Sequence, residues 1–248
     1  METKLHFEIL PQPDDFTCGP TCLHAVYTYY EHELPLEQVI REVPKLEEGG
    51  TLGVLLGCHA LRQGFQALIY TYDLQVFDPT WFRPGAESLT AKLAAQAAAK
   101  DKPKLREATE AYLEFLAAGG QIHMEDLTTG LIRRYLQREA PILTGLSATY
   151  LYRTAREYGP KSDADDVRGL PAGHFVVLCG YDPPSRGVLV ADPLMPNPMA
   201  PGQNYVLGVD RVLCAILLGT LTYDANLLII QPGKKRQRSR RGDPDRRQ

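Results

Sequence analysis

The sequence predicts one α+β domain, with helices mainly in the first half of the chain and strands mainly in the second. In the first half, apolar residues recur at helical spacing among strong helix formers. Later segments are short apolar runs bounded by glycine and proline. The 248 residues are 44% hydrophobic and 23% charged, a composition typical of a globular protein with a sizeable core.

Helices are expected where one face is apolar and the ends carry stop signals. They span residues 18–30, 35–43, 53–63, 88–100, 104–118 and 126–139. Gly64 follows the third of these segments and Gly119-Gly120 follows the fifth, as glycine often does at a helix C-terminus.

Strands are expected from runs of alternating or continuous apolar residues. They span residues 7–10, 65–73, 141–147, 174–181, 188–192, 205–209 and 227–230. The turn sequence Pro-Pro-Ser-Arg-Gly joins 174–181 to 188–192, so these two strands should form an antiparallel hairpin.

Charge is unevenly distributed along the chain. The formal net charge is -3, but residues 234–248 carry +6 and the remaining residues -9. We therefore expect a folded domain over residues 1–231 and a disordered basic tail over 232–248. The net charge does not favour nucleic acid as a partner, except for weak binding through the tail.

The cysteines and the apolar segments indicate a compartment. Five widely spaced cysteines, an odd number, do not form a disulfide framework. The first residues lack the pattern of a secretory signal, and the longest apolar stretch, 212–221, is too short to span a bilayer. We expect a cytoplasmic protein without a membrane partner.

Cys18 is the candidate nucleophile. It lies where a loop gives way to a helix, and a helix start stabilises a thiolate through free N–H groups and the helix dipole. Pro20 suits a first helical turn, and Gly19 would allow a substrate carbonyl to approach the backbone. The amide of Gln12 could stabilise an oxyanion together with the Cys18 N–H. The alternative is a turn followed by an ordinary buried cysteine.

His174 and Asp192 are the candidate base and its orienting group. His174 opens one strand of the predicted hairpin and Asp192 closes the other, so both should lie at the same end of the sheet. A catalytic cysteine needs such a histidine held by a third group. The alternative is a histidine at a strand end beside an unrelated Asp-Pro turn.

No metal or cofactor is predicted. Cys18, Cys22 and His24 are close in sequence, but they do not share one helical face and no second ligand cluster accompanies them. His59 lies in a predicted helix and is not expected to act chemically. The chain also lacks the glycine patterns of phosphate- or dinucleotide-binding loops.

Several motifs occur in the order found in a known family. Gln12, Cys18-Gly19-Pro20-Thr21, Gly173-His174-Phe175-Val176-Val177, Gly180-Tyr181-Asp182 and Ala191-Asp192-Pro193 together resemble the bacteriocin-processing peptidases, which cleave leader peptides after a double glycine. The resemblance implies a papain-like fold. It also implies Cys18 as nucleophile, His174 as general base and acid, Asp192 as orienting group and Gln12 as oxyanion donor.

The chain departs from this family pattern in two ways. Those peptidases are usually fused to a membrane transporter, whereas this chain is expected to be a stand-alone form. A largely helical segment, 76–140, also lies between the nucleophile region and the histidine strand, where we expect it to form a lid or a subdomain over the cleft.

Three functions follow from these observations. The first is hydrolysis of a peptide or isopeptide bond through a thioester on Cys18, with a peptide or peptide-like acyl substrate. The second is acyl or aminoacyl transfer at the same site, and the third is a catalytically silent peptide-binding module. The segment around Tyr150 and Tyr152 is rich in hydroxyl groups and could contact the substrate.

Overall fold

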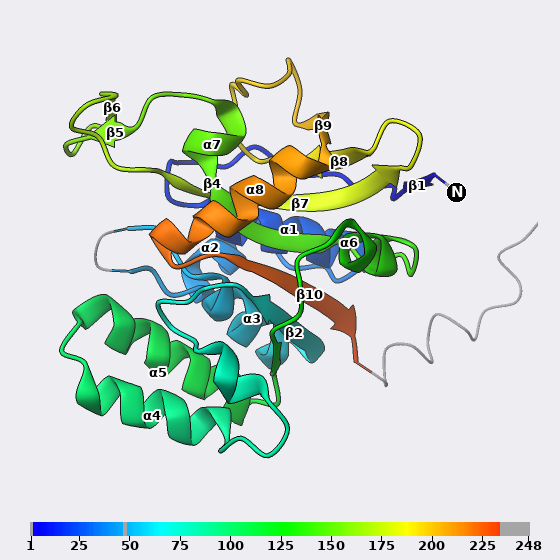
Figure 1. Ribbon diagram of the computed structural model, residues 1–248. Helices are drawn as coiled ribbons and strands as arrows, with labels where there is room; N and C mark the ends of the chain where they lie inside the picture. The colour runs from blue at the N-terminus through cyan, green and yellow to red at the C-terminus, as the bar shows by residue number, and fades with distance from the viewer. Residues whose placement is uncertain (1, 47–48, 234–248) are drawn as a thin grey trace, which may run out of the picture.

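A computed structural model describes residues 2–46 and 49–233 of the chain (Figure 1). The helices are α1 (Cys18–Tyr29), α2 (Leu36–Glu42), α3 (Gly53–Arg62), η1 (Pro79–Phe82), α4 (Leu89–Ala99), α5 (Pro103–Ala117), α6 (Thr129–Leu136), α7 (Ala148–Tyr152), α8 (Val209–Leu218) and η2 (Gly219–Thr222). The strands are β1 (Thr3–Lys4), β2 (Phe65–Thr71), β3 (Gln121–His123), β4 (Ile142–Ser147), β5 (Glu157–Tyr158), β6 (Asp163–Ala164), β7 (Gly173–Asp182), β8 (Gly187–Ala191), β9 (Asn204–Gly208) and β10 (Asn226–Pro232). The predicted basic tail lies outside the described residues from 234 onward.

One large sheet organises the fold, in the order β3-β2-β10-β4-β7-β8-β9, with β1 paired to β7. Its neighbouring strands are antiparallel except β2 and β3, which are parallel. Helix α8 crosses one face, and α1 and α3 lie behind the sheet (Figure 1). Because both faces are covered, all six residues of the central strand β4 are buried. The α+β class and the papain-like fold expected from the sequence describe this architecture.

Two expected elements differ from those observed. The strand expected at 7–10 is wrong: the edge strand is Thr3–Lys4, and residues 7–10 form no strand. Phe7 and Ile9 alternate with polar residues because they pack into the core without a sheet partner. The helix expected at 126–139 is shorter than expected. The Thr128 hydroxyl accepts the Leu131 N–H, so the helix begins at Thr129.

The segment 76–140 is only partly helical and packs beside α3. Cys58 of α3 approaches the Ala111 carbonyl of α5 at 3.6 Å, and a Cβ built on Gly57 would lie 2.7 Å from the Phe115 ring. Within the same segment, β3 extends the main sheet by pairing with β2. Helices α4 and α5 thus lie on the side of α3 away from α1 (Figure 1), and the role of this segment as a lid or a subdomain stays a prediction.

Two buried carboxyl groups, Asp73 and Asp224, lie near the end of the sheet where β2 finishes and β10 begins. Asp224 Oδ1 accepts the Gly53 N–H at 2.8 Å, at the first residue of α3. Burial raises the pKa of Asp224 to about 7, and the neighbouring charge of Asp73 adds to the shift. Burial also raises the pKa of Asp73 to about 6.

These raised pKa values predict that stability depends on pH. Between pH 3.8, the ordinary carboxyl pKa, and about 7, folded Asp224 keeps a proton that the unfolded chain releases, so stability is lost as the pH rises. Asp224→Asn should reduce this loss, because the amide can still accept the Gly53 N–H but does not ionise. Urea unfolding from pH 4 to 7.5 measures the effect, with Asp163→Asn on the exposed strand β6 as the control. An unchanged pH slope in Asp224→Asn would contradict the assignment.

Candidate active site

Cys18 is the first residue of α1 and is partly exposed. Thr17 precedes it and makes no side-chain capping hydrogen bond, and Pro20 has no N–H. The helix start therefore presents backbone N–H groups without a side-chain cap, which favours an anion at this position.

Gly19 is required by packing, and not by substrate access as the sequence suggested. It is buried, and a Cβ added to it would lie 2.8 Å from Thr51 Cγ2 and 3.2 Å from the Phe175 ring. Glycine therefore lets the first turn of α1 approach β7, the strand that carries His174.

His174 and Asp192 meet at the end of the β7–β8 hairpin. Val177 pairs with Ala191, which brings Asp192 close to the first residues of β7. His174 Nε2 and Asp192 Oδ1 are 2.9 Å apart, and both residues are buried.

Cys18 and His174 lie close enough for the charge of one to affect the pKa of the other. Since Nε2 is engaged by Asp192, Nδ1 is the nitrogen that remains for the thiol. Burial alone would lower the pKa of His174, but the negative charge of Cys18 and the hydrogen bonds to Asp192 and Cys18 raise it to about 10. The raised pKa favours the imidazolium form of His174 at neutral pH.

Asp192 accepts four hydrogen bonds. Besides His174, the Leu194 N–H donates to Oδ1 at 3.0 Å, and the Tyr152 and Tyr205 hydroxyls donate to Oδ2 at 2.8 and 2.6 Å. Burial alone would raise the pKa of Asp192, but the hydrogen bond and charge of His174, with the hydrogen bonds from Tyr205 and Leu194, lower it to about 2. The carboxylate is therefore held ionised and in a fixed orientation.

The two tyrosines show where sequence reasoning fell short. The sequence offers Tyr152 only as a possible substrate contact, whereas its hydroxyl binds Asp192. Tyr205 was expected only as a strand residue. Its partnership with Asp192 depends on the pairing of β8 with β9, where Tyr205 lies opposite Val190, and no local pattern indicates that register.

Gln12 is tied to the same region through its backbone. Its N–H donates to the Pro193 carbonyl at 2.8 Å, directly after Asp192. Its side-chain Nε2 donates to the Asp14 carbonyl at 2.9 Å, while Oε1 is buried without a hydrogen-bond partner. One Nε2 hydrogen is thus used within the loop.

The other four cysteines lie in environments different from that of Cys18. Burial raises the pKa of the Cys22 thiol, which lies 3.3 Å from the Phe175 carbonyl, and it raises the pKa values of Cys58 and Cys179 to about 12. Cys214 is exposed on α8.

Neither a metal cluster nor a membrane span was found in the part of the chain that the structure describes. No group of three or more His, Cys, Asp and Glu side chains there is arranged to hold a metal ion. No helix among the same residues has the length and apolar character needed to cross a bilayer. His59 is buried between the Tyr27 hydroxyl and Glu42, at 2.8 and 3.1 Å.

Comparison with known proteins identifies one family that matches this chain. A model of the Peptidase C39-like family matches residues 4–205. A comparison with curated proteins gives no match.

Three solved structures are similar to this chain. A double glycine motif protease from an AMS/PCAT transporter, in complex with the leader peptide, is 14% identical, with 94% of this chain and 99% of that one covered and a TM-score of 0.44. A C39-like peptidase from Bacillus anthracis is 14% identical, with 94% and 100% covered and a TM-score of 0.47. Xylellain, a cysteine protease from Xylella fastidiosa, is 14% identical, with 94% and 86% covered and a TM-score of 0.38. The family model spans most of the chain and includes the residues gathered around Asp192, and by this match the chain belongs to the Peptidase C39-like family.

Proposed function

We propose that this protein is a cysteine peptidase that cleaves a peptide or isopeptide bond through a thioester on Cys18. The observation that carries the proposal is the buried His174–Asp192 pair, with Nε2 and Oδ1 2.9 Å apart, in which the charge of Cys18 raises the pKa of His174. Family membership supports the same reaction class.

The first half-reaction forms the thioester. The Cys18 thiolate attacks the substrate carbonyl carbon, and the carbonyl electron pair moves onto oxygen. The backbone N–H of Cys18 and the free Nε2 hydrogen of Gln12 would donate to this oxyanion. The His174 imidazolium then gives its Nδ1 proton to the leaving amine as the C–N bond breaks.

The second half-reaction releases the acid. Neutral His174 takes a proton from water, which attacks the thioester, and the C–S bond breaks to restore the thiolate. In acyl transfer, an amine replaces this water and every protein group keeps its role.

Tyr152 and Tyr205 serve as positioning residues in this scheme. Neither hydroxyl is assigned to the reacting atoms; both donate to the Asp192 oxygen that His174 does not use. They fix the carboxylate, which in turn fixes the imidazole ring.

The direct test of the proposal is cleavage of a peptide library by the purified protein, followed by mass spectrometry of products and of acylated Cys18. Wild type should generate new termini that the Cys18→Ala protein does not. Equal cleavage by both proteins would end the cysteine-peptidase proposal. Capture of peptides without cleavage would favour the binding module, and transfer of the acyl group to an added amine in preference to water would favour the transferase.

Thiol reactivity should distinguish Cys18 from the other cysteines. At pH 6, iodoacetamide should label Cys18 before Cys214, because an imidazolium and a helix start stabilise the Cys18 thiolate. Cys214 is an exposed thiol within the same molecule and serves as the reference. Peptide mapping at timed intervals gives both rates. His174→Ala should remove the difference, and prior labelling of Cys214 in wild type would contradict the assignment.

The predicted losses on substitution follow a definite order. Cys18→Ala should abolish turnover, and His174→Ala should cost nearly as much, because the two groups act as a unit. Gln12→Ala should lower kcat by about 10²–10³, the usual effect of losing one oxyanion donor, with little change in KM. Asp192→Asn should retain partial activity, since an amide can still orient the ring. Steady-state kinetics measure these changes, and an unaffected kcat in Gln12→Ala would exclude it as an oxyanion donor.

Tyr205→Phe should lower kcat by about tenfold with little change in KM, because the lost hydrogen bond goes to a charged group. It should also raise the pKa of Asp192 from about 2 towards 3.8. A lowered carboxyl pKa contributes stability above pH 3.8 that is lost as the pH falls through about 2, so the variant should lose less stability over this range. Acid unfolding and kinetics measure the two effects, with exposed Tyr158→Phe as the control. A lower kcat without any change in acid unfolding would argue against the positioning role.

A further inference from the structure

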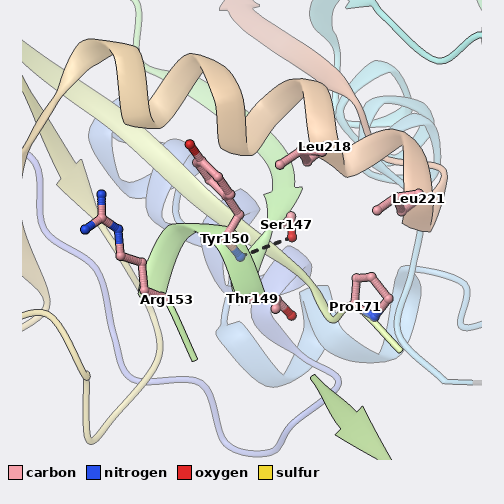
Figure 2. A pocket seen from close by; sticks show the side chains of 7 residues that line it. All are labelled: Ser147, Thr149, Tyr150, Arg153, Pro171, Leu218 and Leu221. Carbon is pink, nitrogen blue, oxygen red and sulfur yellow. Dashed lines mark hydrogen bonds between the residues drawn. The ribbon is translucent and has the colours of Figure 1, made fainter. Parts of the chain in front are cut away.

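An apolar pocket of about 270 Å³ opens between the end of β4, helix α7 and the junction of α8 with η2 (Figure 2). Side chains from four segments line it, namely Ser147, Thr149, Tyr150, Arg153, Pro171, Leu218 and Leu221. Ligand pockets for whole small molecules usually measure about 300–1,000 Å³, so this pocket suits a single large side chain.

The pocket adjoins the candidate active site through two elements. Ser147, on its wall, pairs with Gly173, the residue directly before His174. Helix α7 carries Thr149 and Tyr150 on the pocket wall and, at its last residue, Tyr152, whose hydroxyl binds Asp192. The pocket wall is therefore connected to both His174 and Asp192 through neighbouring residues.

The η2 turn closes against the same strand. A Cβ built on Gly173 would lie 2.8 Å from Thr222 Oγ1, so η2 lies directly over the residue before His174. Leu221 belongs to this turn and lines the pocket. The turn that carries Leu221 therefore contacts the residue directly before His174.

The chemistry of the lining is apolar. The Ser147 hydroxyl oxygen accepts the Tyr150 N–H at 3.3 Å (Figure 2), and the Thr149 hydroxyl oxygen accepts the Ala172 N–H at 2.9 Å. Both hydroxyl groups therefore already have a partner within the protein. Leu218 and Leu221 are 38% and 58% exposed, whereas Val212 and Ile216 on the same helix as Leu218 are fully buried. Exposed leucines that flank a cavity indicate a surface that is covered when a partner binds.

Positive charge at the rim of the pocket limits which residues of a partner can lie there. Arg153 lines the pocket and lies near enough to Arg211 to affect its pKa, which burial lowers first and Arg153 lowers further. These are two positive charges on a body whose charge from residues 1–233 is -9. An apolar side chain followed or preceded by an acidic residue complements this surface.

We propose that this pocket is a specificity subsite that binds one large aliphatic or aromatic side chain of the peptide substrate, close to the scissile bond. The inference rests on the proposed peptidase function and adds to it the type of residue that the enzyme selects. Burying a side chain such as leucine is worth roughly 10- to 100-fold in binding relative to glycine. Arg153 adds a smaller preference for an acidic neighbour.

The test is hydrolysis of a quenched fluorescent peptide library that varies three residues on each side of the cleaved bond. Wild type should prefer leucine or phenylalanine over glycine by about 10- to 100-fold in kcat/KM at one position. Leu221→Glu and Leu218→Glu should each reduce this preference below about threefold. Both leucines are exposed, so the variants should fold. Tyr150→Ala provides a third variant that enlarges the pocket without adding charge.

Val167→Glu, on a loop outside the pocket lining, is the matched control, since Val167 is 79% exposed. It should leave the preference unchanged.

A wild-type enzyme that cleaves peptides without preference at any position, or a preference that survives all three pocket variants, would overturn the subsite while leaving the peptidase proposal intact. If Leu221→Glu instead converts a dimer to a monomer by light scattering without changing the preference, the pocket is a contact between copies and the subsite is again overturned. No cleavage beyond that of Cys18→Ala would end the peptidase proposal and the subsite with it.

Discussion

The buried carboxylate of Asp192 is the constraint on which the rest of the site depends. A buried charge is costly unless it is paired and fully hydrogen-bonded. Asp192 meets this requirement with donors from β7, α7, β9 and the turn after β8. Four segments must therefore converge on one residue, and their convergence fixes the ring of His174. The packing of Gly19 against Thr51 and Phe175 then brings the start of α1 to that ring.

Much of this arrangement could be predicted because it is encoded locally. A turn between two apolar runs indicates the hairpin that joins His174 to Asp192, and a loop ending at Cys18-Gly-Pro indicates a helix start. The supporting tyrosines could not be found in this way, since Tyr205 reaches Asp192 only through the register of two strands. Local patterns identify the groups proposed to react, whereas the groups that hold them depend on tertiary pairing.

The errors in the predicted elements have physical causes of the same kind. Helix α8 is not among the expected helices, because residues 212–221 form a nearly continuous apolar run in the sequence. Val212 and Ile216 enter the core, while Leu217 and Leu218 remain at the surface. Phe7 and Ile9 gave a strand pattern because any extended segment with one buried side alternates, whether or not it pairs in a sheet.

Helix α7 has only five residues, yet one end of it faces the pocket and the other end holds Asp192. A helix of this length behaves as one rigid piece, so a substitution that tilts it to fit a different side chain also moves the Tyr152 hydroxyl. Under the proposed function, selectivity and turnover are then coupled through α7. During evolution, or in a laboratory selection for a new substrate, a change in preference at α7 would be inherited together with a change in rate, and restoring the rate would require a compensating substitution around Asp192.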